Sequence, residues 1–185
     1  ATDTYNTAVG EAAGNQVTTG IQNTLIGALA GDAITTANNN TALGYNSLGL
    51  NTTGNSNVAI GYAALDANTT ASNNTAVGAS ALGANTTGDK NVAIGNSAGD
   101  ANTTGFNNIA IGYDSLGTNT AAGANIAIGY EALKTFNSTS NTSQFNTAVG
   151  TQAGKAVTTG IRNTLIGGAT GFALTDADFN VAIGM

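Results

Sequence analysis

Polar and apolar positions along this chain recur in one short pattern, Asn-x-[Ala/Leu]-[Val/Ile/Leu]-Gly. Eleven copies are present, and nine of the ten intervals between them are seventeen residues long, whereas Asn125 to Asn146 is twenty-one. Self-similarity at a fixed short period is typical of a solenoid, in which each repeat is one coil and neighbouring coils bury each other's faces. The pattern therefore predicts a single repeat domain over residues 1–185.

Within each copy, the apolar residues favour a β-strand over a helix. Residues 57–61 alternate with a period of two, contain β-branched side chains and are bounded by Gly and Asn/Thr clusters. The chain has no Asn-Gly or Asp-Gly dipeptide, the strongest short signal for a hairpin. We therefore expect an all-β fold, a parallel β-solenoid of about eleven 17-residue coils. At ~4.8 Å per coil it would be a rod of roughly 50 Å.

The two faces of each strand differ in size. One face carries Asn57, Ala59 and Gly61, and the other carries Val58 and Ile60. Because both faces hold apolar groups, two arrangements remain open. In the first, the small face points into the coil and the Val/Ile face packs on a second surface, most simply another copy of the chain. In the second, both rows fit inside one wider coil.

The first and last residues of the motif do not vary among the copies. Stacked Asn side chains can hydrogen-bond along the axis as an amide ladder, and a Gly is required by a positive φ or by a close backbone neighbour. We therefore assign a structural role to both columns and expect Gly78→Val to destabilise the stack by about 1 kcal/mol or more. The Asn column is Asn6, Asn23, Asn40, Asn57, Asn74, Asn91, Asn108, Asn125, Asn146, Asn163 and Asn180. The Gly column is Gly10, Gly27, Gly44, Gly61, Gly78, Gly95, Gly112, Gly129, Gly150, Gly167 and Gly184.

A second pair of columns is expected in the core. Four residues after the motif Gly, five coils carry Leu and five carry Gly. Where Gly occurs, the residue three later is usually aliphatic, as at Ile34, and where Leu occurs it is generally Asn, as at Asn68. This trade-off predicts that one large side chain per coil fills a shared volume. Gly99 with Asn102 is the exception, for which Phe106 would compensate.

A threonine column runs along the chain, eight residues after the motif Gly, from Thr18 to Thr175 in nine coils. High β-propensity combined with a hydroxyl ladder accounts for such a column. The functional alternative is a regular array that binds ice or another crystalline surface.

The longer interval places four extra residues within residues 134–145. Insertions in solenoids form loops on one face, which in some cases is the binding face. A tolerated bulge is one interpretation, and a contact loop is the other. The candidate contact residues are Lys134, Phe136, Asn137 and Phe145. Glycosylation at the eight Asn-x-Ser/Thr sequons, which include Asn51 and Asn85, is a further hypothesis.

Composition narrows the classes of function. The chain has no Cys and no His, and four Lys+Arg against ten Asp+Glu give a net charge of −6. No basic patch could follow a phosphate backbone, so we expect no nucleic-acid binding. No apolar run approaches the ~18–20 residues of a spanning helix, so we expect no membrane insertion. Because the carboxylates are scattered singly, we expect no catalytic site, no cofactor and no metal site.

The motifs Asn57-Val58-Ala59-Ile60-Gly61-Tyr62 and Asn74-Thr75-Ala76-Val77-Gly78 resemble the head repeats of trimeric autotransporter adhesins. They also resemble the Asn-Thr-Ala-Val-Gly repeats of phage tail fibres and bacterial surface proteins. The resemblance covers essentially the whole chain. It implies a left-handed β-roll, a side-by-side homotrimer and a role in attachment.

We therefore expect a structural fibre or adhesin repeat domain that attaches to a cell or surface, through a receptor or glycan. It would be extracellular, on a cell surface or a virion. The first alternative is a subunit of a self-polymerising extracellular filament. Residues 13–27 nearly repeat as residues 153–167 and neither end carries a polar cap, so a segment or subunit of a longer fibre is expected. An ice-binding solenoid is the second alternative.

Overall fold

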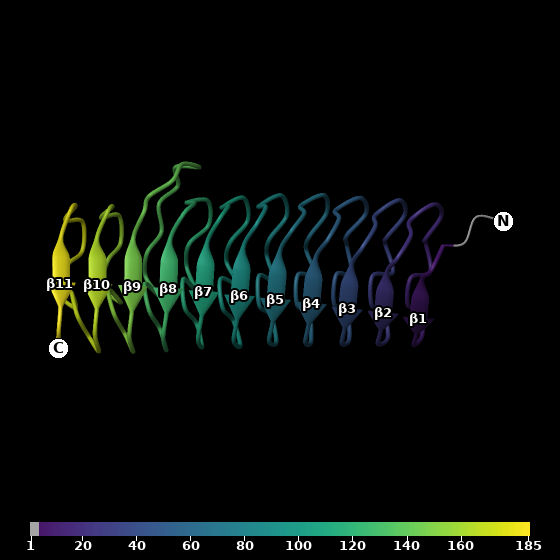
Figure 1. The fold of residues 1–185 in the computed structure, drawn as a ribbon, viewed down its shortest axis with the longest axis horizontal. Helices are drawn as coiled ribbons and strands as arrows, with labels where there is room; N and C mark the ends of the chain where they lie inside the picture. Colours follow the sequence, from purple (N-terminus) through teal and green to yellow (C-terminus); the bar gives the residue numbers. More distant parts are fainter. Residues whose placement is uncertain (1–3) are drawn as a thin grey trace.

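The computed structural model of this chain describes residues 4–185. Its eleven strands form one sheet in which each strand pairs with the next one along the chain, in parallel. The result is a β-solenoid of about ten turns, drawn from the side in Figure 1. The strands are β1 (Thr7–Val9), β2 (Thr24–Ile26), β3 (Thr41–Leu43), β4 (Val58–Ile60), β5 (Thr75–Val77), β6 (Val92–Ile94), β7 (Ile109–Ile111), β8 (Ile126–Ile128), β9 (Thr147–Val149), β10 (Thr164–Ile166) and β11 (Val181–Ile183).

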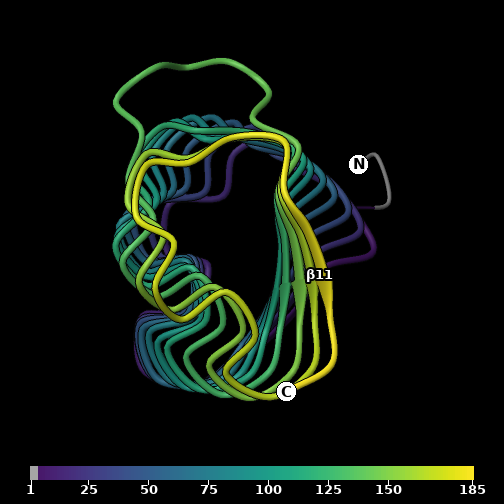
Figure 2. The ribbon, with the colours of Figure 1, turned by 90° about the vertical axis from the view of Figure 1, so that its left-hand side faces the viewer.

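Equivalent residues of successive coils lie directly beside one another. Ala59 of β4 pairs with Ala42 of β3 and with Ala76 of β5. The register holds across the insertion, because Ala127 of β8 pairs with Ala148 of β9. Viewed along the axis in Figure 2, the coils superpose and the sheet forms one side of the cross-section. The predicted parallel stacking is therefore confirmed.

Each strand points its middle residue inward and its other two residues outward. On β4, Ala59 is fully buried, whereas Val58 and Ile60 are half-buried on the outer face. The prediction that the small face lines the interior is confirmed, and the wider coil enclosing both rows is wrong. An Ala side chain fits inside because the opposite wall of the coil, with Leu65 and its equivalents, already fills the interior.

Both reasons offered for the Gly column apply. Gly78 has a φ of 135°, a backbone angle that residues other than glycine rarely adopt. A Cβ at Gly78 would also lie 2.4 Å from the carbonyl oxygen of Gly95 in the next coil. The strand therefore ends before this residue, where the chain turns a corner.

The second pair of columns forms the core, as predicted. Leu48, Leu65 and Leu133 are fully buried, and so are Ile34 and Val157 in coils that carry Gly instead of Leu. A Cβ on Gly31 would lie 2.8 Å from Ile34 Cδ1, so the two positions do share one volume.

Candidate interaction surface

The Asn column lies inside the coil and forms the predicted amide ladder. Asn40 Oδ1 accepts hydrogen bonds from the backbone N–H of Asn57 at 3.0 Å and from its Nδ2 at 3.2 Å. Asn57 Nδ2 also donates to the carbonyl oxygen of Ala71 at 2.9 Å. Asn57 is fully buried, so its polar groups serve the fold.

A second, shorter amide ladder runs beside the first, and sequence reasoning missed it; Asn57 Nδ2 and Asn68 Nδ2, one from each ladder, both donate to the carbonyl oxygen of Ala71. It comprises Asn51, Asn68, Asn85, Asn102 and Asn119. Asn68 Nδ2, for example, donates to Asn51 Oδ1 at 2.8 Å. The ladder ends at Asn119, whose Oδ1 has no partner because the next coil carries Phe136 at this position. Asn in five consecutive coils was the available signal, but it was interpreted only as the absence of a large side chain.

The threonine column lies in bends that follow the second core column, not in strands. Thr52 Oγ1, for example, donates a hydrogen bond to the carbonyl oxygen of Thr69 in the next coil, at 3.1 Å. The predicted ladder thus exists, but most of its hydroxyls reach the backbone of the next coil, whereas Thr120 Oγ1 and Thr175 Oγ1 bond to side chains. The following residue, for instance Thr53, is exposed. The hypothesis that this side binds ice stays a prediction.

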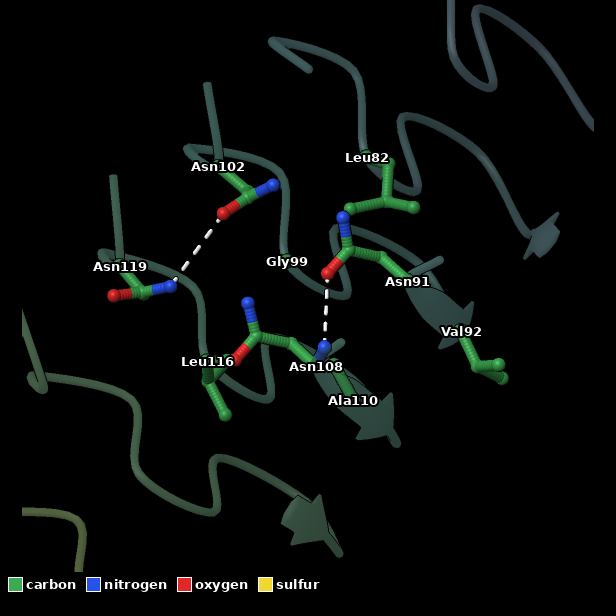
Figure 3. Close-up of a pocket in the computed structure, with 9 residues that line it drawn as sticks. All are labelled: Leu82, Asn91, Val92, Gly99, Asn102, Asn108, Ala110, Leu116 and Asn119. Atoms are coloured by element: carbon green, nitrogen blue, oxygen red, sulfur yellow. Dashed lines mark hydrogen bonds between the residues drawn. The ribbon is translucent and has the colours of Figure 1, made fainter. Parts of the chain in front are cut away.

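A small cavity interrupts the core beside Gly99, where neither core position carries a large side chain. Its volume of about 10 Å³ matches one water molecule. Figure 3 shows Leu82, Leu116 and Asn102 around it. The expected compensation by Phe106 is wrong, because that ring lies half-buried over Gly123 instead, with Cε1 3.1 Å from where a Gly123 Cβ would be.

The inserted segment bulges beyond the outline shared by the other coils, as Figure 2 shows in green. Its base is held by a parallel bridge between Gly123 and Ser143. Of the candidate contact residues, Phe136 is fully buried in the core and Asn137 is half-buried, accepting a hydrogen bond from Thr120 Oγ1 at 3.0 Å. Phe145 alone among the aromatic candidates is exposed. Two of the sequon asparagines, Asn51 and Asn85, are also buried, in the second ladder.

The fourth candidate, Lys134, belongs to a cluster of charges at the start of the insertion. Lys134 Nζ lies 2.8 Å from Asp114 Oδ2 and 2.8 Å from Glu131 Oε1, and Lys155 Nζ lies 2.6 Å from Glu131 Oε2. Hydrogen bonds from Lys134, Lys155 and Gln152 lower the pKa of Glu131 to about 2. Hydrogen bonds to Asp114 and Glu131 raise the pKa of Lys134. These charges link the three coils that flank the insertion.

The outer face of the sheet carries two regular rows of uncharged side chains. Its rows consist of Thr, Val or Ile at the first residue of each strand and Val, Ile or Leu at the third. Leu43 of β3 is 44% exposed, and Ile94 of β6, midway along the rod, is 40% exposed. No charged residue occurs in these two rows of the eleven strands. Apolar surface of this extent is typical of an interface.

Stacked tyrosines border this face at the corner that follows the motif Gly. The ring centroids of Tyr45 and Tyr62 are 5.6 Å apart, and those of Tyr113 and Tyr130 are 5.4 Å apart. All four rings are exposed. At the other end of the strands, the Arg162 guanidinium lies 5.2 Å from the centroid of the exposed Phe179 ring.

No known protein family, curated protein or solved structure matches this chain. Within residues 4–185 no helix has the length and hydrophobicity of a membrane span. The same residues contain no group of three or more His, Cys, Asp or Glu arranged to hold a metal ion. The expectations about attachment, partners and location therefore stay predictions.

Proposed function

We propose that this chain is a repeat domain of a structural fibre, which attaches to a cell or another surface. Its left-handed coils associate side by side as a homotrimer through the outer face of the sheet. The observation that supports this proposal is the uncharged, half-exposed row of Val, Ile and Leu to which every strand contributes its third residue. An isolated chain would leave that whole row in water.

The regularity of the stack suits a fibre. Buried amides bond from coil to coil at the same position, so bending the rod would break many hydrogen bonds at once. A stiff rod presents equivalent shallow contacts at fixed intervals of ~4.8 Å. Weak contacts to a receptor or glycan would then add up through multivalency. The resemblance to adhesin heads and tail fibres agrees with an extracellular position, on a cell surface or a virion.

Mass measurement and imaging of the purified chain test the assembly. A discrete particle of three chains with rods of roughly 50 Å supports the proposal. Indefinite growth of the particles would instead favour the self-polymerising filament. Attachment is tested separately, by binding of the fluorescently labelled chain to whole cells and to a glycan array, and absence of binding to both would overturn it.

A further inference from the structure

Two positions that are exposed or half-buried flank the outer face of every strand. We call the residue before the motif Asn the leading flank and the residue after the motif Gly the trailing flank. On β4 these are Ser56 and Tyr62, and both are exposed. The two flanks lie at the two corners where the sheet side of the cross-section begins and ends in Figure 2.

Aromatic and cationic side chains never occupy both flanks of one strand. On the trailing flank they are Tyr45, Tyr62, Tyr113 and Tyr130, which follow β3, β4, β7 and β8. On the leading flank they are Tyr5, Lys90, Phe145, Arg162 and Phe179, which precede β1, β6, β9, β10 and β11. Where the trailing flank is Tyr, the leading flank is the smaller Asn39, Ser56, Asn107 or Ala124.

Contacts within one chain do not explain this exclusion. The flanks of a strand are six residues apart, and at ~3.3 Å per residue in extended chain they are separated by roughly 20 Å. Side chains at the two corners of one coil therefore cannot collide. Backbone conformation does not explain it either, because Ser56 has a φ of 58° and Phe145 and Phe179 on the same flank also have a φ of 58°.

We propose that the trailing flank of one copy packs against the leading flank of a second copy at the same strand level. The copies then lie parallel and in register, and the same contact repeats around a closed ring. At the level of β4, Tyr62 would meet Ser56 of the partner subunit, and at the level of β6, Asn96 would meet Lys90 of the partner subunit. No junction then receives two aromatic or cationic side chains, and the junctions of β2 and β5 receive none. This inference rests on the side-by-side association proposed above and specifies its geometry.

The outer face of the sheet is large enough for an interface with a second copy of the chain. Eleven strands at ~4.8 Å and a width of roughly 20 Å offer about 1,000 Å² on each copy. Stable interfaces bury about 800 Å² per partner. The two outward rows carry no charge, so a second copy would meet the face without desolvating an ion pair. An antiparallel or offset arrangement would bring different strand levels together and give the exclusion no role.

A size swap at β4 tests the contact. Ser56→Tyr places two large side chains at one junction and should weaken association about tenfold, the usual effect of overpacking. Adding Tyr62→Ala to the same chain restores one large and one small side chain, so association should return to within about threefold of the wild type. Sedimentation measures the association, and circular dichroism verifies that each variant is folded. An unaffected Ser56→Tyr variant, or a swap variant as weak as the single one, would overturn the inference.

Cross-linking tests the register without altering the large side chains. The natural chain has no Cys, so introduced thiols have no competitors. A chain with Asn73→Cys and Ala79→Cys, the two flanks of β5, should form intermolecular disulfides under mild oxidation and stop at the size of the closed ring. The matched control combines Asn39→Cys with Ala79→Cys, which lie at the levels of β3 and β5, and should link at least tenfold less.

The outcomes separate this inference from the proposed fibre. Copies that associate but link equally well in both Cys variants would refute the in-register contact and leave the fibre intact. A chain that stays monomeric at every concentration would refute the contact and the homotrimer, whereas attachment is judged by its own binding assay.

Discussion

Leu82 and Leu116 face each other across a gap in the core, because the coil between them carries Gly99 in the position that both leucines occupy. A Cβ on Gly99 would lie 3.3 Å from Leu82 Cδ2 and 3.9 Å from Ala110 Cβ. The backbone is already that of a leucine, since Gly99 has a φ of 58° and Leu82 one of 51°.

Because the gap of about 10 Å³ is smaller than a leucine side chain, we expect Gly99→Leu to destabilise the chain by about 1 kcal/mol less than Gly31→Leu does. Gly31→Leu is the matched control, because its Cβ would lie 2.8 Å from both Ile34 Cδ1 and Leu25 Cδ2, and overpacking should destabilise that variant. Urea unfolding measures both. Equal destabilisation by the two variants would contradict the assignment of a gap beside Gly99.

The Gly column makes a second prediction. Gly78→Ala should lower the free energy of unfolding by about 3 kcal/mol or more, because its Cβ would lie 2.4 Å from a backbone oxygen that cannot move away. Gly168→Ala is the control, since its Cβ would meet only Thr151 O, at 4.0 Å, and should change stability by less than about 0.5 kcal/mol. Thermal unfolding of the pair is decisive: if both variants melt like the wild type, the close approach of the backbones is not structurally required.

The amide ladder leads to a third prediction. Asn40→Ala removes the acceptor of two bonds from Asn57, at 3.0 and 3.2 Å, and a donor to Gly54 O at 3.0 Å. Asn57 Nδ2 and Gly54 O each keep one other partner, so the buried Asn57 N–H is the group left unpaired and we expect a loss of about 1–3 kcal/mol. The exposed Asn96→Ala should change stability by less than about 0.5 kcal/mol. Hydrogen exchange of the Asn57 amide provides a local readout, and undiminished protection in Asn40→Ala would contradict the ladder's role.

A fourth prediction concerns the pH dependence of stability. Because hydrogen bonds from Lys134 and Lys155 lower the pKa of Glu131 from 4.5 to about 2, the folded state binds this proton more weakly than the unfolded state. The resulting stabilisation is present above pH 4.5 and is lost as the pH falls to about 2.

Glu131→Gln should therefore be less stable than the wild type at pH 6, and the difference should shrink steadily below pH 4.5. Urea unfolding at several pH values measures it. Glu11→Gln, which neutralises an exposed carboxylate in the first coil, is the control variant. A pH-independent difference for Glu131→Gln would show that the carboxylate is not stabilised by its lysine partners.

The stacking could be predicted from the sequence because its cause is local and repeated. A seventeen-residue period with Ala59 between Val58 and Ile60 determines which side chain points inward, and the pairing of β3, β4 and β5 follows. The second amide ladder, the burial of Phe136 and the ion pairs of Lys134 were missed. These depend on how the chain bends between strands, which brings Lys134 within 2.8 Å of Asp114, twenty residues earlier, and leaves the gap at Gly99 unfilled by Phe106.

Pairing of every strand only with its neighbours along the chain has a mechanical consequence. A force applied at the two ends would load all coils in series and peel them off singly from a terminus. Each coil spans ~4.8 Å in the stack and, once detached, would span roughly 60 Å, the reach of seventeen extended residues. Stretching one rod should thus yield a train of equal steps, with one longer step where the insertion is released.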